Sequence, residues 1–480
     1  MRFSQFIISA LFTLAIGIGN APAADKPNII FILADDLGYG DIGCFGQKKI
    51  ITPEIDKMAT EGMKLTDFYA GSTVCAPSRS VLMTGQHTGK TWVRGNSRGD
   101  AQTLRDEDIT VAEKLKDAGY STALIGKWGL GELGSTGHPN RQGFDYFYGY
   151  LNQRHAHNHF PEFLIRNSDR VELQNITDPE WIKMRESQGR PDDGAGWATP
   201  EGRIDYAHDL VVEESLKWLD EQAGSANPFF LYLALNIPHA NNEGTRGTGD
   251  GQDIPGYGIY EDKDWTNPNK GQAAMITRMD SDVGRILAKL RDQGVAENTL
   301  VIFTSDNGHH KEGGNDPKFF DANGPLKGMK RDLSEGGIRV PTVAWWPGKI
   351  ASGSQSDHAA SFSDFMATAC EMSGETTPKN TTSVSFLPSL LGDDAAQKKK
   401  EVLYWEFYEK VSSQAVRFGK WKAIRKPIHK GTVTLFDLSK DLGEENDLNK
   451  AHPEIVKQAK DYMKREHVNN PNWQPKGKKK

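Results

Sequence analysis

Asn28-Ile29-Ile30-Phe31-Ile32-Leu33 is an unbroken apolar run near the start of the chain. Its apolarity is continuous rather than alternating, which is typical of a strand buried on both faces of a parallel sheet. Four similar runs follow, at residues 122–126, 229–235, 299–304 and 340–345. Amphipathic stretches separate them, and residues 273–290 form the clearest helical pattern. This alternation predicts an α/β fold with a large, doubly wound, mostly parallel sheet sandwiched by helices.

The pattern changes past residue 375. Short stretches at 401–407, 414–418, 421–425 and 435–438 predict antiparallel strands, and residues 453–466 predict a last helix. We therefore expect a large α/β domain at 25–375. A C-terminal subdomain at 376–480 is expected to combine a small antiparallel sheet with a helix and a disordered basic tail. The Gly- and Asn-rich segment 241–270 is expected to be a long surface loop near the site.

Residues 1–24 have the pattern of a signal peptide, with Arg2, an apolar run at 6–18 and a small-residue cleavage site at 21–24. We expect an exported protein, periplasmic or secreted, with no membrane anchor, because the apolar run is short for a span. The formal net charge of -6 argues against nucleic acid or an anionic membrane as partner. Three cysteines do not make a disulfide framework, and the pattern leaves open whether Cys44 and Cys370 pair.

Oxygen-bearing side chains follow two of the predicted strands directly. Asp35 and Asp36 come after the first run, and Asp306 and Asn307 come after the run at 299–304. The carboxyl ends of neighbouring parallel strands share one edge of a sheet, so these four donors can surround one hard cation. Several carboxylates favour Ca²⁺, with Mg²⁺ as the alternative.

Cys75 opens the run Cys75-Ala76-Pro77-Ser78-Arg79, and Thr84-Gly85 follows. Pro77 suits the first helical position, which places the thiol at a helix N-terminus with Arg79 one turn on, in a setting that favours an anion. The run resembles the signature of the type I, formylglycine-dependent sulfatases of the alkaline phosphatase superfamily, among them bacterial polysaccharide and aryl sulfatases. In that family a maturation enzyme oxidises the Cys to formylglycine, whose hydrated aldehyde is the nucleophile.

The resemblance extends over residues 28 to about 440 and makes the 25–375 domain the catalytic one. Gly126-Lys127-Trp128-Gly129 is similar to the second signature of the family, and Ile237-Pro238-His239 and Gly328-Met329-Lys330 match further motifs. The catalytic residues that the resemblance implies are Cys75, Arg79, Lys127, His239 and Lys330, with His239 as general acid. The implied metal ligands are Asp35, Asp36, Asp306, Asn307 and Cys75. Many members carry a His where this chain has Gly129, so the base for release of sulfate is left open.

Three further residues are predicted substrate contacts: Gln153, His157 and His310. Gln153 falls where some relatives place a small hydroxyl residue, and His310 is near the metal motif in sequence. The run His155-Ala156-His157-Asn158-His159 could alternatively be a metal tract. For Glu335 and Arg339 we expect a structural ion pair.

The resemblance implies a sulfatase that hydrolyses sulfate esters, with a sulfated carbohydrate as substrate because export and a polar, His- and Trp-rich surround suit polysaccharide breakdown. Its partners would be the sulfated sugar and, transiently, the formylglycine-generating maturation enzyme. Two alternatives stay open: a phosphonate or phosphate ester hydrolase with the same nucleophile, and a non-enzymatic glycan-binding protein with a relic site.

Overall fold

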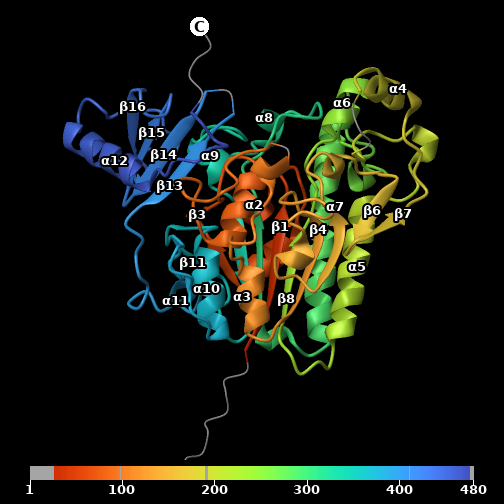
Figure 1. The fold of residues 1–480 in the computed structure, drawn as a ribbon, viewed down its shortest axis with the longest axis horizontal. Coiled ribbons are helices and arrows are strands. Elements are labelled where there is room, and N and C mark those ends of the chain that lie inside the picture. The colour runs from red at the N-terminus through yellow and green to blue at the C-terminus, as the bar shows by residue number, and fades with distance from the viewer. Residues whose placement is uncertain (1–25, 98, 190–192, 410, 476–480) are drawn as a thin grey trace, which may run out of the picture.

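Five parallel strands form the middle of a ten-stranded sheet that runs through the larger part of the molecule (Figure 1). A computed structural model describes residues 26–97, 99–189, 193–409 and 411–475 of the chain. The parallel strands are, in spatial order, β9 (Thr299–Ser305), β1 (Asn28–Ala34), β8 (Phe229–Ala234), β4 (Ser121–Lys127) and β5 (Tyr146–Tyr150). Every residue of β1, β8 and β9 is buried, as their continuous apolar runs predict.

Shorter strands extend the sheet at both edges. Beyond β5 lie β6 (Phe163–Arg166) and β7 (Asp169–Glu172), and beyond β9 lie β10 (Thr342–Trp345), β2 (Met63–Leu65) and β11 (Ser354–Ser356). The run at 340–345 differs from expectation, because β10 pairs antiparallel with β9. Residues 306–341 stay at the carboxyl edge of the sheet after β9, so the next strand starts there and must run back.

Helices cover both faces of this sheet. Ile30 and Ile32 of β1 pack in a core with α1 (Pro53–Glu61), α5 (Ala207–Gln222) and α7 (Asn267–Asp292). Ile29 and Phe31 point to the other face, where the core includes α2 (Cys75–Thr84), α3 (Val111–Asp117), α10 (Asp364–Ser373) and α11 (Leu387–Leu390). The predicted sandwich is thus confirmed, and α7 contains the helix predicted at 273–290.

The C-terminal part is a separate four-stranded antiparallel sheet, drawn in blue in Figure 1. Its strands are β13 (Leu403–Phe407), β14 (Ser413–Phe418), β15 (Trp421–Arg425) and β16 (Val433–Asp437). The last helix, α12 (Pro453–Glu466), covers this sheet through Ala459, Tyr462 and Met463. The small sheet and its helix confirm the predicted fold, while the domain boundary at 375 stays a prediction.

Two terminal segments with predicted roles, 1–24 and 476–480, lie outside the described residues. In the part of the chain that the structure covers, no helix has both the length and the apolarity to cross a bilayer. Cys44, Cys75 and Cys370 are all free thiols, so Cys44 and Cys370 do not pair.

A buried ion network joins the two parts of the molecule. Glu335, in α9 (Glu335–Ile338), is fully buried and accepts hydrogen bonds from Lys422 Nζ of β15 (2.7 Å) and from Tyr69 Oη (2.6 Å) of β3 (Phe68–Tyr69). Arg339 lies 3.5 Å from the same carboxylate, which is the expected ion pair. Burial raises the pKa of Glu335, but the positive charges of Lys422, Arg339 and Arg417 together outweigh it and lower the pKa to about 2. Glu335 is therefore ionised and depends on its basic partners.

We expect Lys422→Met to destabilise the protein by about 3–5 kcal/mol, because it leaves a buried carboxylate without its closest cation. Denaturant unfolding measures the loss. Lys420→Met is the matched control, since Lys420 is half-exposed and its partner Asp437 also accepts hydrogen bonds from Ser439, so the pair should contribute less than about 1 kcal/mol. Equal losses from the two variants would contradict the ionic role of Lys422.

Candidate active site

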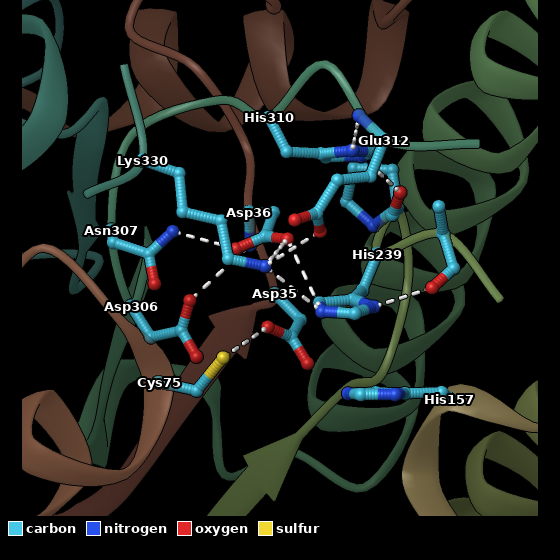
Figure 2. Close-up of polar contacts among 12 residues, drawn as sticks. Asp35, Asp36, Cys75, His157, His239, Asp306, Asn307, His310, Glu312 and Lys330 are labelled. Atoms are coloured by element: carbon cyan, nitrogen blue, oxygen red, sulfur yellow. Dashed lines mark hydrogen bonds and ion pairs between the residues drawn. The ribbon is translucent and has the colours of Figure 1, made fainter. Parts of the chain in front are cut away.

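Four oxygen-bearing residues meet at the carboxyl edge of the large sheet (Figure 2). Asp35 and Asp36 follow β1, and Asp306 and Asn307 follow the adjacent β9; all four are fully buried. The Asp36 backbone N–H donates to Asp306 Oδ1 (3.2 Å), and Asn307 Nδ2 donates to Asp36 Oδ1 (2.6 Å). Strand order thus brings together the groups that the sequence predicted as one cluster.

Cys75 lies against this cluster at the start of α2. The helix begins at Cys75 itself, so Pro77 is its third residue rather than its first. The Sγ atom lies 3.4 Å from Asp35 Oδ1, and the residue is 1% exposed. Burial and the negative charge of Asp35 raise the pKa of the thiol well above its ordinary value. An unmodified Cys75 therefore lacks the thiolate character of a cysteine nucleophile.

Each carboxylate has its own basic partner. Arg79, one turn into α2, donates to Asp306 Oδ2 through Nε (3.1 Å) and Nη2 (2.8 Å). Lys127, the last residue of β4, donates to Asp35 Oδ2. Lys330 Nζ donates to Asp36 Oδ2 (2.7 Å). The predicted sulfate-contacting residues thus surround the carboxylates from three different segments of the chain.

His239 and Lys330 form a hydrogen-bonded pair. His239 Nδ1 lies 2.7 Å from the carbonyl oxygen of Ala240, which assigns the ring proton to Nδ1. Nε2 then accepts from Lys330 Nζ (3.0 Å), which also donates to Glu312 Oε2 (3.1 Å). Burial and the charge of Lys330 lower the pKa of His239 well below its ordinary value. The imidazole is neutral, and the proton nearest to its Nε2 atom is held on Lys330.

The three predicted substrate contacts have different surroundings. The His157 ring stacks on His239 with centroids 4.5 Å apart, and its Nδ1 lies 3.1 Å from Glu243 Oε2. His310 is buried, with Nε2 near the Pro238 carbonyl (3.1 Å) and Nδ1 accepting from the Glu312 backbone N–H (3.0 Å), so the backbone occupies both of its nitrogens. Gln153 lines the cavity above Cys75, as His157 does.

The histidines at 155–159 point in different directions. His155 packs against the rings of Tyr150 and Phe163, and His159 Nε2 lies 2.9 Å from the His239 carbonyl oxygen. None of the three belongs to a group of potential metal ligands within the described ranges. The geometry therefore does not support a metal tract in this run.

Two acidic residues near the site were not found from the sequence. Glu312 holds Lys330 and also accepts from Arg331 Nη1 (2.6 Å). Glu243 lies in α6 (Asn242–Thr248), inside the segment expected to be a loop, and that expectation is wrong for this part. The signal for the helix was present, because Asn241 accepts from the Gly244 N–H as an N-cap and Gly249 ends the helix in a left-handed conformation.

A cavity of about 470 Å³ opens above Cys75. Its lining includes Arg154, His157, His239, Lys330 and Arg331. Three of these side chains are formally positive, although Arg154 also pairs with Asp193, and the lining residues that the structure describes include no carboxylate. The charge of the cavity therefore favours an anionic ligand positioned over Cys75.

The acidic cluster beneath the cavity fits a hard cation. One donor atom from each of Asp35, Asp36, Cys75 and His239 lies within 4.8 Å of the others. Asn307 Oδ1 is buried and has no hydrogen-bond partner in the described part of the chain, so an amide oxygen is free beside Asp36. Carboxylate and amide oxygens are the donors that Ca²⁺ and Mg²⁺ prefer.

Comparisons with known proteins agree with this geometry. The family profile described as Sulfatase matches residues 27–375, and the profile "N-sulphoglucosamine sulphohydrolase, C-terminal" matches 328–469. The chain is 31% identical to the N-acetylgalactosamine-6-sulfatase of Canis lupus familiaris over 421 residues, covering 85% of this chain and 73% of that protein. It is 28% identical to the N-acetylgalactosamine-6-O-sulfatase of Bacteroides thetaiotaomicron, covering 92% and 94%. The crystal structure of Ps i-CgsB in complex with k-i-k-neocarrahexaose superposes with a TM-score of 0.72 at 27% identity, covering 94% of each chain.

Proposed function

The chain belongs to the sulfatase family and is a sulfuric ester hydrolase, and we propose that its substrates are sulfated carbohydrates. The observation that carries the proposal is the positively charged cavity directly above Cys75. Two relatives are named as sulfatases of N-acetylgalactosamine, and a related structure binds a neocarrahexaose, which supports a sugar substrate. Export, inferred from residues 1–24, is consistent with an extracellular or periplasmic polysaccharide.

We propose that Cys75 is oxidised to formylglycine by a maturation enzyme that binds the chain transiently. The modified residue would supply a hydrated aldehyde as nucleophile. Cys75 is suited to this role, because it lies at the N-terminus of α2, next to Asp35 and beneath the cavity. Arg79, Lys127 and Lys330 would orient the sulfate group and stabilise negative charge on its oxygens.

The pair formed by Lys330 and His239 would deliver the proton to the leaving oxygen. His239 Nδ1 is fixed by the Ala240 carbonyl, so Nε2 is the atom that exchanges a proton with Lys330 Nζ. His239 and Lys330 both line the cavity and can reach a bound ester. The proton passes to the departing alcohol either from Nε2 or from Nζ, with Glu312 keeping Lys330 in place.

Gly129 offers no base for the release of sulfate, and His157 is the residue we propose for this step. Glu243 holds its Nδ1, which leaves Nε2 to take a proton, and the ring lines the same cavity as Cys75. Burial raises the pKa of Glu243, but the hydrogen bond from His157 and the charge of Arg154 lower it below its ordinary value. Glu243 therefore stays ionised and can orient the imidazole.

We also propose that Asp35, Asp36, Asp306, Asn307 and the modified Cys75 hold one divalent cation. Ca²⁺ is favoured over Mg²⁺, because three carboxylates and an amide oxygen suit the larger ion. The cation would stabilise negative charge on the sulfate group.

Removal of the cation should destabilise the folded protein. At a Ca²⁺ concentration 100 times Kd, binding adds about 2.7 kcal/mol to the free energy of unfolding. Chelation should therefore lower the thermal unfolding midpoint of wild type, Ca²⁺ should restore it, and Asn307→Leu should reduce the response. Two zinc ions per chain in elemental analysis would instead point to a phosphatase-like site.

The proposed function is tested with protein expressed beside a formylglycine-generating enzyme. Mass spectrometry of the Cys75 peptide should show the modified residue, and a panel of sulfated mono- and oligosaccharides should contain substrates. Aryl sulfates should react faster than matched aryl phosphates, and Cys75→Ser should be inactive where the host oxidises only Cys. Faster hydrolysis of the aryl phosphates would overturn the choice of a sulfated sugar.

His239→Ala should affect substrates according to their leaving group. A general acid matters only where the departing oxygen needs a proton in the transition state, so sugar sulfates should lose ~10²–10⁴-fold in kcat/KM and activated aryl sulfates much less. His452→Ala, a half-exposed residue next to α12, is the control. An equal loss on both substrate types would mean that His239 shapes the site and does not transfer the proton.

A further inference from the structure

Gly129 and Gln153 lie side by side at the edge of the cavity above Cys75, which we call the reaction cavity. Gly129 has a φ of +80°, and a Cβ atom built on it would lie 2.4 Å from Gln153 Oε1. The Gln153 carboxamide therefore occupies the room that a side chain at position 129 would need. Gln153 lies in the turn that follows β5, the strand next to β4.

The Gln153 side chain is buried without a hydrogen-bond partner. The residue is 8% exposed, and neither Oε1 nor Nε2 bonds to any residue that the structure describes. A buried amide that stays unpaired costs about 1–3 kcal/mol for each group, so such a group is expected to bind water or a ligand. Because Gln153 lines the reaction cavity, that ligand is part of the substrate or lies next to it.

Gln153 also lines a second cavity, of about 190 Å³, which we call the Gly129 chamber. Its lining includes Gly129, Gly131, Glu132, Asn152 and Asp193. Both cavities are lined by Gln153, Arg154, Ser97 and Gln102, so the chamber adjoins the reaction cavity. Its volume is more than ten times the ~10–15 Å³ that a single water molecule requires. It can therefore hold a larger group.

The two cavities differ in charge. The described lining of the Gly129 chamber has two carboxylates, Glu132 and Asp193, and one cation, Arg154. The Arg154 guanidinium is already paired with two carboxylates, since Nη1 lies 2.7 Å from Asp193 Oδ2 and Nη2 lies 3.4 Å from Glu243 Oε1. No spare positive charge remains for a second sulfate or a carboxylate. Carboxylate and amide oxygens instead accept hydrogen bonds from hydroxyl groups.

We propose that the Gly129 chamber is a subsite for a neutral sugar residue linked to the sulfated one, and that Gln153 is its specificity-determining contact. The proposal rests on the proposed function, which supplies the sulfated sugar in the reaction cavity. It adds that the substrate is at least a disaccharide, and that the residue next to the sulfate ester carries hydroxyl groups and no charge. A side chain at position 129 would close this subsite.

The first test compares kcat/KM for three substrates: a sulfated monosaccharide, a disaccharide with a neutral neighbour, and a disaccharide whose neighbour is also sulfated. Wild type should favour the neutral neighbour over both others. Gln153→Leu keeps the length of the side chain but removes its hydrogen bonds, so the preference for disaccharide over monosaccharide should fall about 10-fold. Its thermal unfolding midpoint should not fall, because the amide makes no hydrogen bond within the described protein.

Glu132→Gln removes a negative charge from the chamber. We expect it to raise kcat/KM for the disaccharide with the sulfated neighbour about 10-fold relative to wild type. Glu180→Gln is the matched control, since Glu180 lies on the surface in α4 (Pro179–Ser187) and pairs with the exposed Lys183. A wild-type preference for the sulfated neighbour, or an unchanged ratio in Gln153→Leu, would overturn the proposal.

A binding measurement separates this proposal from the proposed function. Titration calorimetry with the unsulfated disaccharide and protein that retains unmodified Cys75 reports on the chamber without catalysis. If the disaccharide binds and Gln153→Leu weakens this binding about 10-fold, the subsite is supported even when no sulfated sugar is hydrolysed. The lack of hydrolysis would then overturn only the proposed function. Hydrolysis of sulfated sugars together with no difference between wild type and Gln153→Leu in this titration would overturn the subsite alone.

Discussion

The mutual repulsion of three buried carboxylates is the constraint on which the rest of the site depends. Asp35, Asp36 and Asp306 are fully excluded from solvent at the ends of two adjacent strands. Negative charges placed so close together in a region of low polarity are unfavourable unless nearby cations offset them. The offset comes from Arg79, Lys127 and Lys330, which reach the cluster from α2, from β4 and from the loop before α9. The groups that would bind a sulfate ester are thus also the groups that allow the acidic cluster to stay buried.

The same logic continues outward from the cluster. Lys330 is held by Glu312 and contacts His239, so the position of the predicted proton donor depends on the charge balance around Asp36. Further out, Glu335 in α9 is neutralised by Lys422 of the C-terminal sheet. The small sheet therefore helps to hold the loop that carries Lys330. The ring of Trp405 in this sheet also packs against Tyr69 of the large domain, in an apolar cluster that extends to the residue before Cys75.

Most of the secondary structure followed from local patterns. The continuous apolar runs at β1, β4, β8 and β9, the apolar stripe of α7, and the short stretches of the C-terminal sheet all form the predicted elements. Two local expectations failed for physical reasons. The direction of β10 depends on the edge of the sheet at which the preceding loop ends, and no local sequence pattern records that position. The helix α6 has little apolar periodicity because the side chain it buries is Glu243, a charged group that is paired in the fold.

The sequence by itself determined the fold class, the identity of the acidic and basic residues at the strand ends, and the position of Cys75 before a helix, because each depends on residues close together in the chain. Only the tertiary structure decided which groups share a proton or a cavity. Three contacts between separate segments show this: Glu312 binds Lys330, Glu243 binds His157, and Gln153 fills the space beside Gly129. Their pairing depends on burial and distance, and those quantities exist only once the strands have been placed side by side.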